Sequence, residues 1–129
     1  MSYQYKVKEK KVNLTGETQY KFFATPVSMG QVSTDEIINE IAERTTLAPS
    51  DLVGAITALS SIITEKIKRG YSVKLDRLGT FGLSITSDGF SDAAKCTPAK
   101  VKAKKVWFRA DKRMKEAVSD TNFERYIHE

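Results

Sequence analysis

The sequence has few of the residues from which catalytic and metal-binding sites are built. Its 129 residues include one cysteine, Cys96, and one histidine, His128. A single cysteine excludes an intramolecular disulfide and a cysteine-based metal cluster. The histidine lies in a segment expected to fray, without a titrating partner. We also find no glycine-rich phosphate loop and no nucleophile–base pair, so we expect no enzyme activity, cofactor, metal ion or small-molecule substrate.

Long apolar runs are also absent. No window of the sequence approaches the roughly 20 apolar residues that a membrane-spanning helix needs. The first residues, MSYQYKVKEKK, lack the apolar stretch of a signal peptide. Together with the single cysteine, this predicts a soluble cytoplasmic protein with no membrane partner.

Positive charge is concentrated in one segment. The net charge is +5, but residues 95–118 alone carry nine basic and two acidic side chains, whereas residues 34–70 are net acidic. Lys100, Lys102 and Lys104 are two residues apart, so in an extended strand they would share one face. Such a row suits the phosphates of a nucleic acid, whose condensed counterions are released on binding. On charge alone, a lysine-rich strand edge that resists aggregation is an equally good interpretation.

Two alternating segments open the chain. In residues 3–12, Tyr3, Tyr5 and Val7 alternate with polar side chains, and residues 20–25 form a second such segment that ends at Pro26. A period of two is typical of half-buried strands. The pair predicts an N-terminal β-hairpin.

Two helices are predicted next. Ser33 and Glu36 form a capping box, which starts a helix that ends near residue 45. A second helix begins at Pro49 and stops at Gly70. Its apolar residues cover about half of the helical wheel, more than a one-sided stripe; they are Leu52, Val53, Ile56, Leu59, Ile62, Ile63 and Ile67. The excess predicts a subunit interface.

The remaining pattern completes an α+β fold. Residues 71–75 and 81–85 alternate as a second hairpin, residues 86–94 form a loop or mobile arm, residues 104–109 form a strand and residues 111–118 a short helix. In the tail, Phe123, Tyr126 and Ile127 have helical spacing. We divide the chain into an N-terminal β extension (1–32), a central domain (33–118) and a C-terminal tail (119–129).

Three segments, in this order, resemble the HU/IHF family of bacterial histone-like proteins. STDEIINEIAERTTLAPSDL resembles the family's helix–turn–helix opening, GYSVKLDRLGTFGLSI its hairpin and FRADKRMKEAV its closing strand and helix. The chain looks closest to the longer HU-related branch that has an N-terminal extension. The resemblance implies an intertwined homodimer with a two-helix base under a β-sheet and protruding β-arms. It also implies nonspecific double-stranded DNA binding by an architectural protein of the nucleoid.

The charge pattern and the resemblance together predict a set of DNA-contacting side chains. By position, Arg109, Lys112 and Lys115 match basic positions of the family's closing segment, and Lys104 matches a lysine late in the return strand of the arm. The full predicted set is Lys95, Lys100, Lys102, Lys104, Lys105, Arg109, Lys112, Arg113 and Lys115.

The sequence also departs from the family pattern. The outgoing arm strand, residues 83–88, has no cation, the Arg-Asn-Pro tip motif is missing, and Asp111 replaces a family glycine. These departures leave open an HU-fold protein-interaction or assembly module with weak or lost DNA binding. Structured RNA is a third possibility for the same charges.

Overall fold

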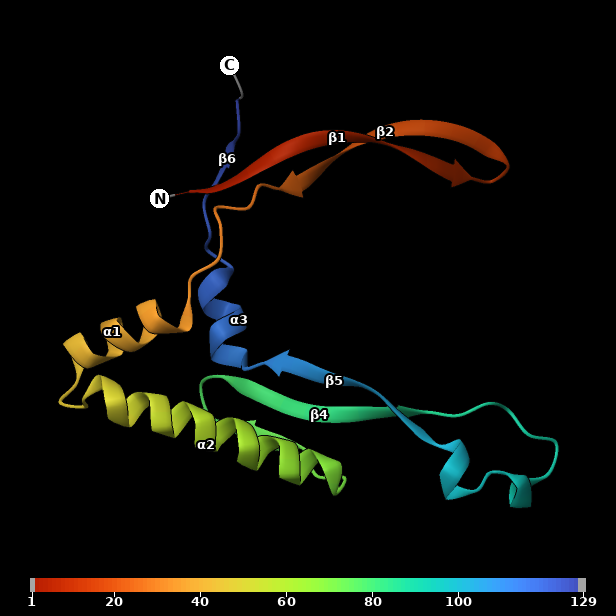
Figure 1. The fold of residues 1–129 in the computed structure, drawn as a ribbon. Coiled ribbons are helices and arrows are strands. Elements are labelled where there is room, and N and C mark those ends of the chain that lie inside the picture. The colour runs from red at the N-terminus through yellow and green to blue at the C-terminus, as the bar shows by residue number, and fades with distance from the viewer. Residues whose placement is uncertain (1, 128–129) are drawn as a thin grey trace. The chain divides into compact units, whose positions relative to one another are not determined.

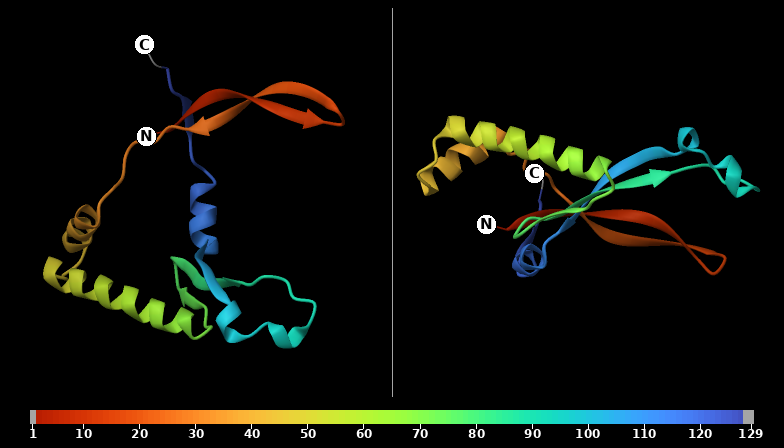
Figure 2. Two further views of the ribbon diagram at one scale, coloured as in Figure 1. Left: turned by 45° about the vertical axis from the view of Figure 1, so that its right-hand side comes forward. Right: turned by 90° about the horizontal axis from the view of Figure 1, so that it is seen from below.

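The computed structural model describes residues 2–127, which form two compact units. One unit is continuous and comprises Ser33–Ala117. The other combines residues 2–32 with residues 118–127. Figures 1 and 2 show the elements of both units.

The continuous unit begins with two helices, α1 (Thr34–Arg44) and α2 (Pro49–Lys68). The predicted cap of α1 is confirmed: the Ser33 hydroxyl oxygen accepts a hydrogen bond from the Glu36 backbone N–H at 3.3 Å. Pro49 starts α2, and the chain reverses after it at Gly70, where φ is +92°. Ile38, Leu52 and Ile67 are the buried large hydrophobic side chains of this unit.

A three-stranded antiparallel sheet follows, in the order β3-β4-β5. Its strands are β3 (Val73–Leu75), β4 (Gly79–Thr86) and β5 (Lys102–Ala110). The register pairs Val73 with Phe81 and Phe81 with Phe108, so these side chains share one face. That face is apolar throughout, and α2 contacts β3 and β4; its members are Val73, Leu75, Phe81, Leu83, Ile85, Ala103, Val106, Phe108 and Ala110.

The connection from β4 to β5 extends beyond the end of α2, together with the distal part of the two strands (Figure 1). It contains two short 3₁₀ helices, η1 (Ala93–Lys95) and η2 (Pro98–Lys100). After β5 the unit ends in α3 (Lys112–Val118). The predicted second hairpin, return strand and closing helix are therefore present, with β5 two residues longer at its start than the pattern indicated.

The other unit is built around a long hairpin. β1 (Tyr3–Leu14) and β2 (Glu17–Pro26) pair from Tyr5 with Pro26 to Leu14 with Glu17, and Thr15 and Gly16 join them. Both turn residues have positive φ, +46° and +79°, as a two-residue type I′ turn requires. The predicted N-terminal hairpin is therefore confirmed.

The tail differs from its prediction. Phe123–Arg125 forms β6, which pairs in parallel with the start of β1, so the expectation from helical spacing is wrong. The backbone groups of β1 that β2 leaves free provide the reason: Tyr3 N–H donates to Asn122 O, and Tyr126 N–H donates to Tyr5 O, each at 2.8 Å. The rings of Tyr3 and Phe123 also lie 5.8 Å apart.

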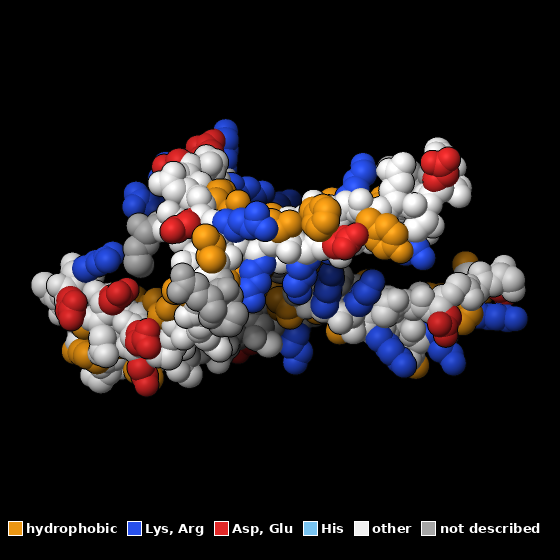
Figure 3. Space-filling model, turned by 90° about the horizontal axis from the view of Figure 1, so that it is seen from above, with side chains coloured by type: hydrophobic (Ala, Val, Ile, Leu, Met, Phe, Trp, Pro, Cys, Tyr) orange, Lys and Arg blue, Asp and Glu red, His pale blue; other side chains and the backbone are white. Residues whose placement is uncertain are grey.

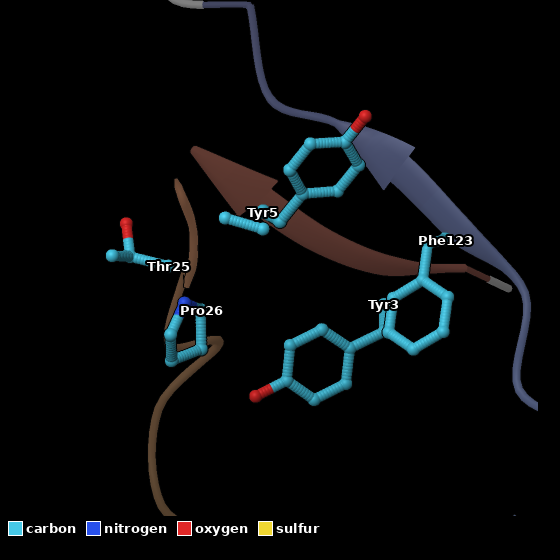
Figure 4. A pocket seen from close by; sticks show the side chains of 6 residues that line it. Tyr3, Tyr5, Thr25, Pro26 and Phe123 are labelled. Carbon is cyan, nitrogen blue, oxygen red and sulfur yellow. The ribbon is translucent and has the colours of Figure 1, made fainter. Parts of the chain in front are cut away.

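An apolar cavity of about 470 Å³ lies on one face of this small sheet (Figure 4). It is lined by Tyr3, Tyr5, Ala24, Thr25, Pro26 and Phe123. The opposite face of the hairpin carries lysines together with Phe23 and Val12. Within residues 2–127, no helix is both long and apolar enough to cross a membrane.

Candidate nucleic-acid interface

The second face of the β3-β4-β5 sheet is polar and basic. Thr80, Gly82, Ser84 and Thr86 alternate along β4 and therefore share a face. Their partners are Arg109, Trp107, Lys105 and Lys102 on β5, and Lys74 on β3 pairs with Thr80. The sheet thus separates cations on one side from an entirely apolar surface on the other. We call Lys74, Lys102, Lys105 and Arg109 the basic sheet face.

A β-bulge changes the predicted lysine row. Ser84 pairs with Lys105 but the next residue, Ile85, pairs with Ala103, so Lys104 is the extra, unpaired residue. As a result Lys102 and Lys105, three residues apart, face the same side. The expectation that Lys100, Lys102 and Lys104 share a strand face is wrong, because Lys100 ends η2 outside the strand and the bulge breaks the alternation.

Trp107 and Phe108 point to opposite faces. The Phe108 ring lies 5.0 Å from that of Phe81 on the apolar face. Trp107 lies on the basic face, where its ring covers Gly82: a Cβ atom added there would overlap the indole. The Arg109 guanidinium lies 5.9 Å from the Trp107 ring, within reach of a cation–π contact. An aromatic surface flanked by cations is therefore available to a nucleic acid.

The start of α3 adds further cations beside this face. The Asp111 carboxylate accepts a hydrogen bond from the Arg113 backbone N–H at 3.2 Å and caps the helix. A shallow cavity of about 340 Å³ brings residues of β3, β4, β5 and α3 together. Its lining is Lys74, Thr80, Arg109, Ala110, Asp111, Lys112 and Lys115. Four cations around one concave surface can donate hydrogen bonds to phosphate oxygens, opposed by one carboxylate.

Lys74 is a candidate that the sequence interpretation did not include. It lines this cavity and a neighbouring one with Asp76, Arg77, Asp111 and Arg113. The sequence signal for Lys74 is its position between Val73 and Leu75, which both lie on the apolar face. That alternation places Lys74 on the same side as Arg109 once the strand order is known.

The nine predicted side chains lie in three places. Lys95 and Lys100 belong to η1 and η2, four members belong to β5, and three belong to α3. All nine are exposed. In the described part of the chain, Lys112 is the only one of them that pairs with a carboxylate, that of Glu116 at 4.0 Å. An exposed pair of this kind contributes little, so the positive charge remains available to a ligand. In Figure 3, Lys and Arg side chains (blue) project from the face drawn.

The lesser candidates lie apart from the basic sheet face or outside the described residues. Cys96 is a free, exposed thiol. The first turns of α1 and α2 contain Asp35, Glu36 and Asp51. Acidic side chains there stabilise the helix by interacting with the positive end of its dipole. His128 lies outside the described residues. Across residues 2–127, no group of three His, Cys, Asp or Glu side chains could hold a metal ion.

Comparison with known proteins identifies the family. No curated protein matches the chain. A similar fold occurs in the crystal structure of a candidate bacterial DNA-binding protein from Bacteroides vulgatus ATCC 8482, with a TM-score of 0.64 and 13% identity. The match covers 96% of this chain but 48% of that one, so the chain spans about half of its length. The HU-HIG family model, described as an HU domain fused to a wHTH, Ig or glycine-rich motif, matches residues 1–125, and the chain therefore belongs to this HU-like family.

Proposed function

We propose that the protein binds double-stranded DNA through its phosphate backbone, without sequence preference, as an HU-like architectural protein of the nucleoid. In this proposal it is a homodimer of the longer HU-related branch, and it has no catalytic role. Membership of an HU-like family supports DNA as the ligand. So does the description of the structural neighbour as a candidate DNA-binding protein.

The observation that carries the proposal is the one-sided charge of the β3-β4-β5 sheet. Lys74, Lys102, Lys105 and Arg109 share the face opposite the apolar one. Lys112 and Lys115 lie next to it, around the cavity at the start of α3. Each phosphate that such a surface neutralises releases a condensed counterion, which favours binding at low salt. Lysine binds phosphate as a point charge and is therefore suited to contact that ignores sequence.

The homodimer is supported by apolar surface that the single chain leaves exposed. On α2, Val53 and Ile62 are each 50% exposed. On the apolar sheet face, Val106 is 58% and Phe108 51% exposed. Exposed apolar surface of this kind marks a protein interface. A second chain covering both elements would complete the core.

The second candidate function is protein assembly through the same fold. It is favoured by the distal half of β4, which carries no cation, and by the exposed aromatic side chains of the hairpin, such as Tyr20 and Phe22. In this case the basic sheet face keeps the protein soluble. The two functions differ in whether duplex DNA binds at all.

A salt series of duplex binding tests the proposal. The single tryptophan, Trp107, lies on the basic sheet face, so its fluorescence is a direct probe. We expect duplex DNA to change its emission, and added salt to reverse the change. Replacement of Lys102, Lys105 and Arg109 by Gln should lower the salt slope by about one per lost phosphate contact.

The control variant removes the same charge elsewhere: Lys11, Arg44 and Lys68 to Gln. It should retain more affinity and a steeper salt slope than the sheet variant. Equal slopes for the two variants would contradict the assignment of the site. If a folded sample at low salt binds no duplex, the assembly function is favoured, and if RNA outcompetes duplex DNA, the ligand is RNA.

A further inference from the structure

The N-terminal hairpin has a basic face of its own. In the β1–β2 register, Lys6 pairs with Thr25, Lys8 with Phe23 and Lys10 with Lys21. These residues alternate along their strands, so all four lysines lie on one face of the ribbon. We call Lys6, Lys8, Lys10 and Lys21 the hairpin lysine face. The other face carries the apolar cavity and the side chains of Val7 and Phe22.

We propose that the hairpin lysine face is a second contact surface for the backbone of duplex DNA. It lies in the compact unit formed by residues 2–32 and 118–127, whereas the basic sheet face belongs to Ser33–Ala117. The inference rests on the proposed function only in naming duplex DNA as the ligand.

The charges of this face are not neutralised within the protein. All four lysines are exposed, and none has a carboxylate within 4.0 Å among the described residues. Lys10 Nζ lies 5.8 Å from the Phe23 ring and Lys6 Nζ 5.3 Å from the Tyr126 ring, contacts that leave the charge in place. Glu9 pairs with Phe22 and thus belongs to the other face. On the lysine face, Glu17 and Glu124 lie at opposite ends of the ribbon.

The placement of Lys10 directly opposite Lys21 favours an external anion. Like charges facing each other across an antiparallel pair destabilise it. A bound anion removes this cost. Lys6, Lys8 and Lys10 span about 13 Å of strand at regular intervals, which suits a repeating polyanion better than a single small ion.

The shape of the element favours a duplex. A two-stranded β-ribbon is narrow enough to enter the major groove, where phosphates line both sides. A membrane surface fits less well, because the two most exposed aromatic residues of β2, Tyr20 and Phe22, lie on the face opposite the lysines, and only the less exposed Phe23 lies beside them. An interfacial element presents its apolar side to the lipid, and would here hold the lysines away from the headgroups.

Three variants of the full chain, each with three cations replaced by Gln, test the inference. The hairpin variant changes Lys8, Lys10 and Lys21, the sheet variant changes Lys102, Lys105 and Arg109, and the control variant changes Lys11, Arg44 and Lys68. The three variants therefore have equal net charge. In the control variant, Lys11 lies on the opposite face of the same hairpin. Duplex affinity is measured across a salt series.

We expect the hairpin variant to lose at least tenfold more affinity at low salt than the control. The slope of log affinity against log salt should fall in magnitude by about two to three, because each lost phosphate contact removes about 0.9. Replacing the same lysines by Arg should retain wild-type binding, because the charge is kept. Circular dichroism should show an intact fold, since no native ion pair is removed.

The outcomes separate this inference from the proposed function. If the sheet variant loses affinity and the hairpin variant behaves as the control, the inference is wrong and the proposed site stands. If only the hairpin variant loses affinity, the assignment of the basic sheet face as a DNA-binding site is wrong and the inference stands. Loss of binding to phosphatidylserine vesicles without loss of duplex binding would assign the lysines to a membrane and overturn the inference, as would a wild type that binds no duplex.

Discussion

Asp111 caps a helix and also lies among the cations of the proposed DNA-binding site. Its carboxylate caps α3 through the Arg113 N–H, and its backbone N–H donates to Leu78 O at 2.9 Å. It is also the one acidic side chain lining the cavity formed with Lys74, Arg109, Lys112 and Lys115. A negative charge at this position repels a phosphate that the cations attract. If the protein binds DNA as proposed, the helix cap and the DNA affinity place opposite demands on the same side chain.

Two substitutions at Asp111 separate these effects. Asp111→Asn retains a capping side chain, so the free energy of unfolding should be unchanged. Duplex binding at low salt should become about fivefold tighter, since one charge a few Å from a phosphate contributes ~1 kcal/mol in water. Asp111→Ala should also bind more tightly but lose about 0.5–2 kcal/mol of stability. Urea denaturation and fluorescence titration measure both quantities; weaker binding by the Asn variant would exclude this role.

At the scale of elements, local signals predicted the helices well. The capping box at Ser33, the proline at 49 and the glycine at 70 each act within one turn of the chain, and the structure places the ends of α1 and α2 beside them. The alternation of residues 3–12 and 20–25 likewise predicted the hairpin. These features depend on neighbours in sequence and can be derived from sequence.

Features that depend on a distant strand could not be predicted in this way. The bulge at Lys104 is a property of the β4–β5 register, so the pattern of β5 alone gave the wrong lysine row. The inclusion of Lys74 in the site requires the strand order β3-β4-β5. β6 forms because Tyr3 and Phe123 meet across nearly the whole chain. A three-residue strand has too short a pattern to be distinguished from a helical turn.

The basic sheet face depends on close packing between β4 and β5, which Gly82→Ala tests. The new methyl group would overlap the Trp107 ring and force it off the sheet. Overpacking of this kind costs about 1–3 kcal/mol, and the emission of the displaced Trp107 should shift to longer wavelength. Gly89→Ala is the control, because nothing lies within 4 Å of a Cβ atom there. Equal stability and equal emission for the two variants would show that Trp107 does not lie on Gly82.

At the scale of the whole molecule, the chain buries little apolar surface. Ile38, Leu52 and Ile67 are its only buried large hydrophobic residues in the part that the structure describes. Domains of this size usually bury a larger apolar core. In the proposed homodimer, the second chain would cover the exposed apolar side chains of α2 and of the apolar sheet face and so enlarge this core. The proposed homodimer therefore has a consequence for folding as well as for DNA binding.

If folding requires the second chain, stability depends on protein concentration. We expect Tm to rise when the protein is concentrated, because dilution favours the unfolded monomer. Leu59→Glu, on α2, places a charge where the partner would bury it, and should lower Tm and the dimer mass measured by analytical ultracentrifugation. Met29→Glu is the control, since Met29 is 83% exposed and lies outside α2. A wild type that sediments as a monomer and melts at the same temperature over a hundredfold range of concentration would exclude the dimer, because a chain stable by itself would not need α2 covered.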